Sequence, residues 1–203
     1  VSVRDDDNHR PEGYDYADCH FHKKLANFET IGANAARKAL AKLGAKKIAT
    51  ATLPIIIENR NVRRITRGFF DALDGRNIYR KQSFLADKKG QKIGSDKFII
   101  VDDPLILEGA GSRLYDGDGF AAKKRTIIEA GVLKDFYIDW YYSRKLGCEP
   151  TSGSTGNMIV PAGTRSVDEI IKDLGKGILI TDFLGGNSNP TTGDFSVGIF
   201  GQF

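Results

Sequence analysis

Apolar residues recur at helical spacing in the first long patterned segment of the chain, residues 27–44. They run from Ile31 to Leu43 at every third or fourth position, as on one face of a helix. Asn27 suits the N-cap, and Gly44 suits the position just beyond the last turn. The pattern therefore predicts a helix between these two residues.

Three shorter segments follow: residues 61–73 predict a helix, residues 139–147 a short helix or a turn, and residues 166–177 a helix. The first follows a continuous apolar run and carries Arg63, Arg64 and Arg67, with Arg60 just before it. In the last one, Ser166 and Glu169 have the spacing of a capping box, in which each side chain binds the other residue's backbone N–H group. Glycines close the three helical patterns, at Gly75, Gly147 and Gly175.

Alternating or continuous apolar residues predict strands in most of the remaining chain. Residues 46–58 become continuously apolar, as a buried strand would, with Pro54 at an edge or bulge. Residues 120–139 predict a hairpin around the turn Glu129–Gly131. The other predicted strands are residues 2–4, 77–85, 96–104, 158–163, 177–185 and 189–201. Because strands bunch together instead of alternating with helices, the order favours an α+β fold.

Composition narrows the functional classes only modestly. The chain has 203 residues, 40% of them hydrophobic, which is enough for a substantial core in one large domain. A net charge of +4 gives little ground for nucleic-acid binding. Two distant cysteines form no disulfide framework and favour the cytoplasm, and no segment is long enough to span a membrane. From its abrupt ends we expect a fragment of a longer protein.

The first candidate for chemistry is the run Cys19, His20, Phe21 and His22, because a thiol and imidazoles bind zinc. Neighbouring residues on an extended chain point to opposite faces, so only His20 and His22 share a side. His9 is the only other histidine, and no second ligand pair is present. We expect a solvated or interface role for these residues.

Two acidic pairs lie in turn-like sequence. Asp102 and Asp103 end a strand before Pro104, where paired carboxylates could bind a cation or cap a turn. Asp116 and Asp118 resemble half of a calcium loop without its later ligands, which favours a tight turn. The glycine-rich loops match neither a P-loop nor a nucleophile elbow. The spacing of residues thus reveals no catalytic apparatus.

Longer motifs, however, resemble the TldD/PmbA family, whose older label is modulator of DNA gyrase. The matching segments are Asp102–Pro104, Tyr115–Gly119, Gly131–Leu133, Tyr142–Gly147, Thr155–Asn157 and residues 189–201. Two upstream segments, residues 43–57 and 77–93, resemble the PmbA (TldE) branch in particular. The resemblance extends from about Tyr14 to the end of the chain. Two departures are that Arg144 directly follows Ser143 and that Tyr115 replaces a phenylalanine.

The resemblance implies an α+β fold: a β-rich C-terminal domain with a few packed helices, occupying residues 1–203. The N-terminal α/β domain and the last strands of the family would then be missing from this chain. TldD-type members are zinc peptidases with an HExxxH motif on a helix. PmbA-type members pair with them in a cytosolic complex that acts on unfolded or modified peptides.

At the positions that match HExxxH, this chain carries Thr66, Arg67 and Asp71. Arginine stays protonated in proteins and cannot act as the general base, and the two histidine ligands are replaced. The resemblance therefore implies a subunit with no catalytic residue and no metal of its own, with zinc in a TldD-like partner. We expect the candidate peptide-binding or interface residues to be Asp102, Asp103, Tyr115, Asp116, Asp118 and Asn157.

Two other hypotheses stay open. One is a non-enzymatic regulator that binds DNA gyrase or nucleic acid through the basic residues Arg60, Arg63, Arg64, Arg67 and Lys123–Arg125. Such a protein would bind DNA with an affinity that falls steeply with salt. The other is a homodimer that has lost the function of the family.

Overall fold

The computed structural model describes residues 1–5 and 9–202, and the chain divides into two compact units, Val1–Thr52 and Leu53–Phe203. The prediction that all 203 residues form one family domain stays a prediction. Helices and mostly antiparallel strands are segregated along the chain, so the predicted α+β class is confirmed. None of the helices formed by the described residues combines the length and the apolar character needed to cross a bilayer.

The first unit is organised around helix α1, Phe28–Leu40, which follows the short 3-10 helix η1, His22–Lys24. As predicted, Asn27 caps the helix, because its side chain accepts a hydrogen bond from the backbone N–H group of Glu29 at 2.9 Å. The helix ends earlier than predicted, and Gly44, with a φ of +67°, follows after an additional turn.

Helix α1 packs closely against the segment that leads into it. A Cβ atom on Gly13 would lie 2.3 Å from the carbonyl oxygen of Ala35, so only glycine allows this approach. Asp15 accepts hydrogen bonds from the side chains of Asn34 at 3.1 Å and Lys38 at 3.2 Å. Of the predicted strand at residues 2–4, the structure retains an isolated antiparallel bridge between Ser2 and Glu12.

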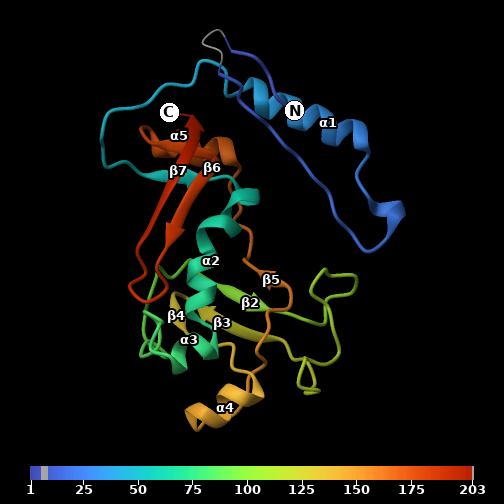
Figure 1. Ribbon diagram of the computed structural model, residues 1–203, viewed down its shortest axis with the longest axis vertical. Helices are drawn as coiled ribbons and strands as arrows, with labels where there is room; N and C mark the ends of the chain where they lie inside the picture. The colour runs from blue at the N-terminus through green and yellow to red at the C-terminus, as the bar shows by residue number, and fades with distance from the viewer. Residues whose placement is uncertain (6–8, 203) are drawn as a thin grey trace. The chain divides into compact units, whose positions relative to one another are not determined.

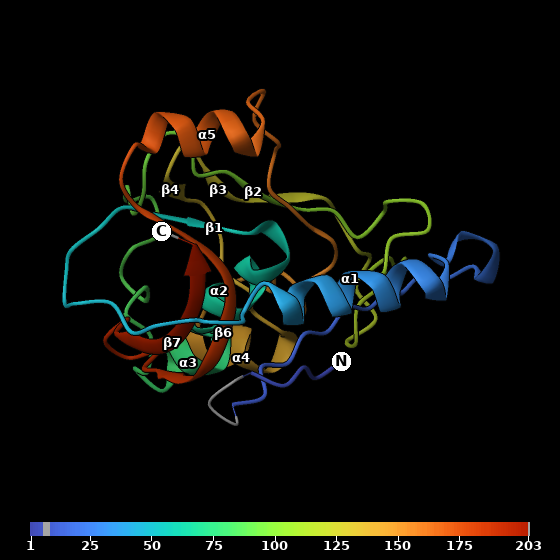
Figure 2. The same ribbon diagram turned by 90° about the horizontal axis from the view of Figure 1, so that it is seen from above.

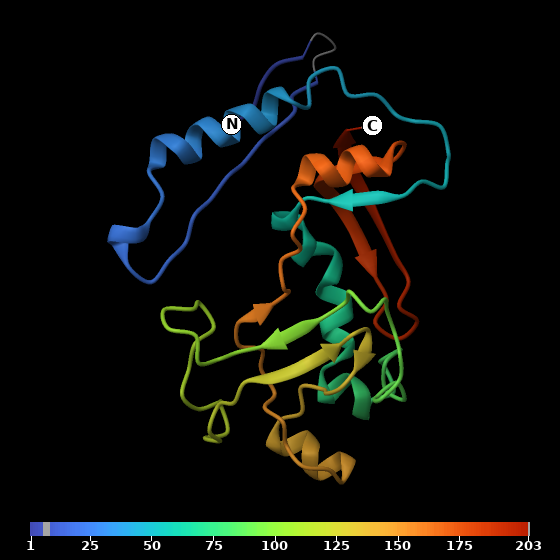
Figure 3. The same ribbon diagram turned by 180° about the vertical axis from the view of Figure 1, so that it is seen from behind.

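One sheet of the second unit has the strand order β1-β6-β7. Strand β1, Ile55–Ile57, runs parallel to β6, Ile178–Ser188, and β6 pairs antiparallel with β7, Phe195–Gln202. Because β1 pairs only with the first residues of β6, the β6–β7 hairpin continues beyond it (Figure 3). Of the strand predicted over residues 46–58, only Ile55–Ile57 forms, since this edge strand begins after Pro54, which has no N–H group to donate.

The other sheet of the second unit is antiparallel, with the order β4-β3-β2-β5. Its strands are β2, Ile100–Asp102; β3, Arg125–Glu129; β4, Val132–Leu133; and β5, Met158–Ile159. The predicted β3–β4 hairpin is confirmed. Its two turn residues, Ala130 and Gly131, have φ angles of +47° and +77°, as the favoured two-residue turn requires.

Helix α2, Val62–Ala72, joins the apolar clusters of the two sheets (Figure 1). Near its start, Ile65 packs against the cluster of the first sheet, formed by Ile178, Ile180 and Phe183. Further along, Phe69 and Phe70 pack against the cluster of the second sheet, which includes Ile127, Ile128 and Leu133. The helix thus has the packing role expected of an apolar stripe, in this case shared between two cores.

The predicted strand at residues 77–85 is wrong. The segment starts within helix α3, Gly75–Tyr79, and continues through turns. The Asp74 side chain accepts from the backbone N–H group of Arg76 at 2.8 Å, and the Ser83 hydroxyl donates to the carbonyl oxygen of Ala72 at 2.5 Å. Such local side-chain bonds offer the backbone an alternative to strand pairing, while Phe84 and Leu85 still reach the core.

The helix predicted over residues 166–177 is confirmed with its capping box, and the short helix or turn predicted over residues 139–147 forms a helix. In α4, Trp140–Leu146, the side chain of Asp139 caps the first turn and Gly147 ends the helix at a φ of +66°. In α5, Val167–Leu174, Ser166 and Glu169 form the predicted capping box. Figure 2 shows α4 beside α3, in agreement with the Tyr79 and Tyr142 rings, whose centroids are 6.0 Å apart.

Candidate functional site

Two loops meet where strand β2 ends, and Asn157 holds them together. The Asn157 backbone carbonyl accepts from the N–H group of Asp103 at 2.9 Å, and its side-chain amide donates to the Asp103 carbonyl at 2.8 Å. The amide also donates to Ser112 Oγ at 2.9 Å and accepts from the N–H group of Gly111 at 2.8 Å. The loops after β2 and before β5 are therefore fixed to each other.

Glycine makes this junction possible. A Cβ atom on Gly111 would lie 2.4 Å from the carbonyl oxygen of Gly156, and one on Gly156 would lie 2.7 Å from Asp102 Oδ1. Both distances are shorter than any real carbon contact, so the two backbones approach in a way that side chains forbid. The resemblance of these glycine-rich loops to the family therefore has a packing reason.

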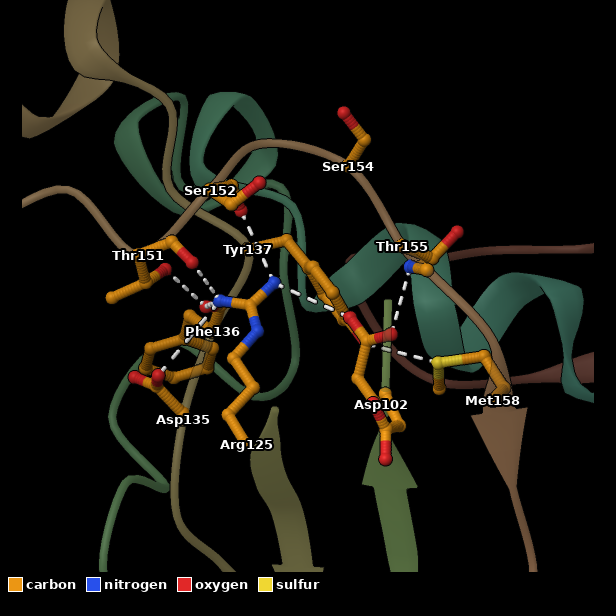
Figure 4. Close-up of polar contacts among 12 residues, drawn as sticks. Asp102, Arg125, Asp135, Phe136, Tyr137, Thr151, Ser152, Ser154, Thr155 and Met158 are labelled. Atoms are coloured by element: carbon orange, nitrogen blue, oxygen red, sulfur yellow. Dashed lines mark hydrogen bonds and ion pairs between the residues drawn. The ribbon is translucent and has the colours of Figure 1, made fainter. Parts of the chain in front are cut away.

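Asp102 is almost fully buried, with 1% of its surface exposed. Its Oδ1 accepts a hydrogen bond from the N–H group of Gly156 at 2.8 Å, and its Oδ2 lies 3.6 Å from Nη2 of Arg125 (Figure 4). A buried carboxylate persists only when it is paired and hydrogen-bonded, and both conditions are met here.

Arg125 extends from β3 towards the loops on either side of α4 (Figure 4). Its guanidinium donates to the carbonyl oxygens of Phe136 at 3.3 Å, Thr151, and Ser152 at 3.3 Å. It also lies 4.4 Å from the ring centroid of Tyr137. These contacts make Arg125 the centre of a hydrogen-bonded network that links β3 to both loops.

Tyr137 closes one side of this network. Its hydroxyl donates to the Met158 sulfur at 3.0 Å. Burial raises the pKa of the Tyr137 hydroxyl far above its ordinary value, and the negative charge of Asp102 raises it further. The phenol therefore stays protonated at neutral pH and is not suited to act as a general base.

A pocket of about 530 Å³ opens beside this network, a volume within the usual range for small-molecule sites. Four of its lining residues are basic and three are acidic, and the others are small, apolar or hydroxylated. The lining consists of Asp102, Pro104, Arg113, Asp116, Phe120, Ala121, Ala122, Lys123, Lys124, Arg125, Asp135, Pro150, Thr151 and Ser152.

Two lining residues have unusual local structure. Arg113 donates to the carbonyl oxygens of Thr155 at 2.7 Å and Ser154 at 2.6 Å, while its Nε is buried without a partner. Ser152 has a φ of +83°, which side chains rarely adopt, and its hydroxyl oxygen is also buried without a partner. Strained backbone and unpaired polar atoms are features that cluster at functional sites.

The structure brings some of the predicted site residues together. Asp102 and Asp116 line the pocket, and Asn157 and Asp103 fix its loops. The Asp103 side chain accepts from the N–H group of Leu105 at 3.0 Å and lies 3.2 Å from Lys124 Nζ, so it caps the turn at Pro104.

The remaining candidates lie in the tight turn that precedes β3. Asp116 accepts from the N–H groups of Asp118 at 3.0 Å and Phe120 at 2.9 Å, as a turn residue would. Asp118 accepts from the N–H group of Trp140 at 3.0 Å and thereby supports the start of α4. Tyr115 is 68% exposed and is not part of the pocket lining.

The positions that match the family's metal motif do not fit zinc. The Thr66 hydroxyl donates to the carbonyl oxygen of Val62 at 3.0 Å, within its own helix. Arg67 offers only donors, and Asp71 is the one carboxylate of the set. Across residues 1–5 and 9–202, no group of three His, Cys, Asp or Glu side chains is placed to hold a metal ion. Cys19, His20 and His22 are exposed.

Sequence reasoning missed Arg113, Ser152 and the inward position of Arg125. The sequence places Arg125 in a basic run available to nucleic acid, whereas its side chain is only 14% exposed and its neighbour Lys124 pairs with Asp103. No local pattern marks these residues, because they meet only after the strands pair. Ser152 could have been suspected only from its place in a loop rich in Ser and Gly.

Comparison with known proteins gives consistent matches. Residues 50–203 match the family described as PmbA/TldA metallopeptidase C-terminal domain. The Haemophilus influenzae protein named Metalloprotease PmbA homolog is 32% identical over 191 residues, which cover 93% of this chain and 42% of that protein. Metalloprotease PmbA of Escherichia coli O157:H7 is 31% identical over 175 residues, which cover 85% of this chain and 39% of that protein. The chain thus spans about two fifths of the length of these relatives.

Solved structures agree with this result. A Bacteroides thetaiotaomicron protein described as a candidate modulator of DNA gyrase has a TM-score of 0.95 and 34% identity, over 99% of this chain and 46% of that one. TldE from Thermococcus kodakarensis has a TM-score of 0.68 at 24% identity, over 82% of this chain and 42% of that one. This likeness supports the fold alone. The chain belongs to the PmbA/TldA metallopeptidase family and carries its C-terminal domain.

Proposed function

We propose that this chain is a PmbA/TldE-like subunit of a cytoplasmic metalloprotease complex that acts on unfolded or modified peptides. In this proposal the chain binds peptide and a TldD-like partner, and the zinc ion belongs to that partner. The observation that carries the proposal is a contrast within the second unit. The loops that resemble the family build an ordered pocket, while Thr66, Arg67 and Asp71 offer no zinc ligand set.

The sheet edges suggest how peptide would be bound. In the order β1-β6-β7, the outer edge of β7 pairs with no strand among the described residues. An extended peptide that adds to such an edge gains backbone hydrogen bonds, which tolerate many side-chain sequences. This mode of binding suits a subunit that receives unfolded peptides.

Metal analysis and a peptidase assay test the proposal. The purified chain alone is expected to contain no stoichiometric zinc and to leave an unfolded peptide intact. Mixed with a TldD-type paralogue, it is expected to raise cleavage above that of the paralogue alone, which is the necessary control. Stoichiometric zinc together with cleavage by the lone chain would refute the subunit proposal.

The partner can be sought independently of activity. A pull-down from the native cytoplasm with this chain as bait is expected to recover a paralogue bearing an HExxxH motif. Mass measurement of the recovered complex distinguishes a heteromer from a homodimer. A homodimer that recruits no paralogue would instead support the hypothesis that the family function has been lost.

A further inference from the structure

We infer that the pocket beside Arg125 binds a carboxylate group of the peptide, with Arg113 and Ser152 as its hydrogen-bonding partners. The inference rests on the proposed function, because it presupposes that the chain binds peptide. It adds the chemical group that is recognised and the residues that recognise it. The carboxylate could come from the C-terminus of the peptide or from an Asp or Glu side chain.

Two unpaired atoms point to a missing acceptor. In the described part of the chain, Arg113 Nε and Ser152 Oγ are the buried side-chain nitrogen and oxygen atoms without a hydrogen-bond partner. Both belong to residues that line the same pocket. Native proteins pair nearly all such atoms, and the Arg113 nitrogen can only donate. A ligand oxygen would satisfy the arginine and could also accept from the serine hydroxyl.

The charges of the lining indicate an anion. Asp102 and Asp135 already lie 3.6 and 3.9 Å from Arg125, and Asp135 also pairs with Lys89 at 3.0 Å. Among the described residues, Arg113 has no carboxylate partner, although it lies in the pocket wall. A partly buried cation without a counter-ion is unfavourable unless a ligand supplies one.

The guanidinium of Arg113 is already held in place. Its two terminal nitrogens donate to the carbonyl oxygens of Thr155 and Ser154, which fixes the direction of the remaining N–H groups. Ser152 is likewise fixed, at a strained φ of +83°, while its carbonyl accepts from Arg125. Binding groups that are oriented in advance lose little conformational entropy when a ligand arrives.

A carboxylate fits this setting better than a phosphate. The three acidic residues of the lining would repel a dianion, whereas a planar monoanion matches the geometry of a guanidinium. The volume of about 530 Å³ exceeds what a small ion needs. Pro104, Phe120 and Pro150 add apolar surface for the side chain of the residue that carries the carboxylate.

Three peptides that share one unfolded sequence test the inference. One has a free C-terminus and no acidic residue, the second is its C-terminal amide, and the third is the amide with one internal Glu. Titration calorimetry with the 203-residue chain is expected to show that the acid-free amide binds at least about tenfold more weakly than one of the others.

The pattern of affinities identifies the source of the carboxylate. Tighter binding of the peptide with the free C-terminus identifies the C-terminal carboxylate as the recognised group. Tighter binding of the Glu peptide identifies the acidic side chain. Equal affinity for all three peptides would overturn the carboxylate inference and leave peptide binding intact. Failure of every peptide to bind would contradict the peptide-binding part of the proposed function, and this inference with it.

Matched variants assign the recognition to the two residues. Ser152→Ala removes a hydroxyl that makes no hydrogen bond in the fold, and Arg113→Lys keeps the charge but removes Nε. Both variants are expected to bring the ratio between the affinity for the carboxylate-bearing peptide and the affinity for the acid-free amide close to one. Arg80→Ala, at a residue outside the lining, is the control and should keep the preference.

A preference that survives Ser152→Ala and Arg113→Lys unchanged would overturn the assignment. Arg113 also supports the loop, so its variant could lose its fold, which a thermal unfolding scan would reveal. The serine variant then decides alone, because its hydroxyl makes no hydrogen bond in the folded chain.

Discussion

Arg125 Nη2 lies 3.6 Å from Asp102 Oδ2, and the two side chains are only 14% and 2% exposed. The pair joins adjacent strands, β3 and β2, at the point where the pocket loops depart. Asp102 also accepts from the Gly156 N–H group, and Arg125 donates to three loop carbonyl oxygens, so one ion pair positions both sides of the pocket. The stability of the second unit and the shape of the pocket therefore depend on the same residues.

Removal of the Asp102 carboxylate is expected to destabilise the second unit. Asp102→Ala leaves the Arg125 charge and the Gly156 N–H group without this partner, at a cost of about 3 kcal/mol. Asp102→Asn keeps an acceptor for Gly156 and is expected to cost about half as much. Urea unfolding followed by the fluorescence of Trp140, the only tryptophan, reports on this unit.

The two variants also test the role of charge. If Asp102→Asn is as damaging as Asp102→Ala, the ion pair dominates, and the bond to Gly156 contributes little. If neither variant shifts the urea midpoint, the proposed dependence of the loops on this pair is wrong.

Gly111→Ala is expected to destabilise the chain by about 1–3 kcal/mol, because its Cβ would meet the carbonyl oxygen of Gly156 at 2.4 Å. Gly117→Ala in the same segment is the matched control. Its Cβ would meet nothing within 4 Å, so its effect should stay within about 0.5 kcal/mol. Equal urea midpoints for the two variants would contradict the close approach of the loops.

The β3–β4 turn offers a substitution that should stabilise the fold. Ala130 adopts a φ of +47°, which glycine reaches without strain, so Ala130→Gly is expected to add up to about 1 kcal/mol. Gly131→Ala should have the opposite effect, because its φ is +77° and its Cβ would lie 2.3 Å from the carbonyl oxygen of Gly94. Equilibrium unfolding of both variants checks the predicted opposite signs.

The capping box of α5 is expected to make stability depend on pH. Hydrogen bonds from the backbone and side chain of Ser166 lower the pKa of Glu169 below its ordinary 4.5. The stabilisation is therefore fully present above pH 4.5 and is lost as the pH falls through the lowered pKa. Unfolding of Glu169→Gln and of the parent chain should differ at neutral pH and converge in acid.

A second variant separates the capping box from a general effect of charge. Ser166→Ala removes the hydroxyl that bonds to Glu169, so part of the pH dependence attributed to this carboxylate should disappear. A gap between Glu169→Gln and the parent chain that stays constant from pH 7 to pH 3 would contradict the predicted linkage.

Sequence alone located the elements whose signals are local. The caps at Asn27 and Ser166 and the turn at Gly131 act over a few residues, and their elements formed as predicted, although α1 ends earlier than its pattern does. The strand predicted after Asp74 did not form, because short-range hydrogen bonds of side chains stabilise α3 and turns in its place. Local signals conflict there, and packing against the core decides between them.

The sequence by itself determined the chemistry at the family's metal positions, since a hydroxyl, a guanidinium and one carboxylate cannot replace two imidazoles and a base whatever the fold. Only the tertiary structure decided the pocket. Arg113, Arg125 and Ser152 come from three separate segments, and the pairing of β2 with β3 and β5 brings those segments together. Contacts between distant segments depend on the global arrangement of the strands, which no local pattern of side chains encodes.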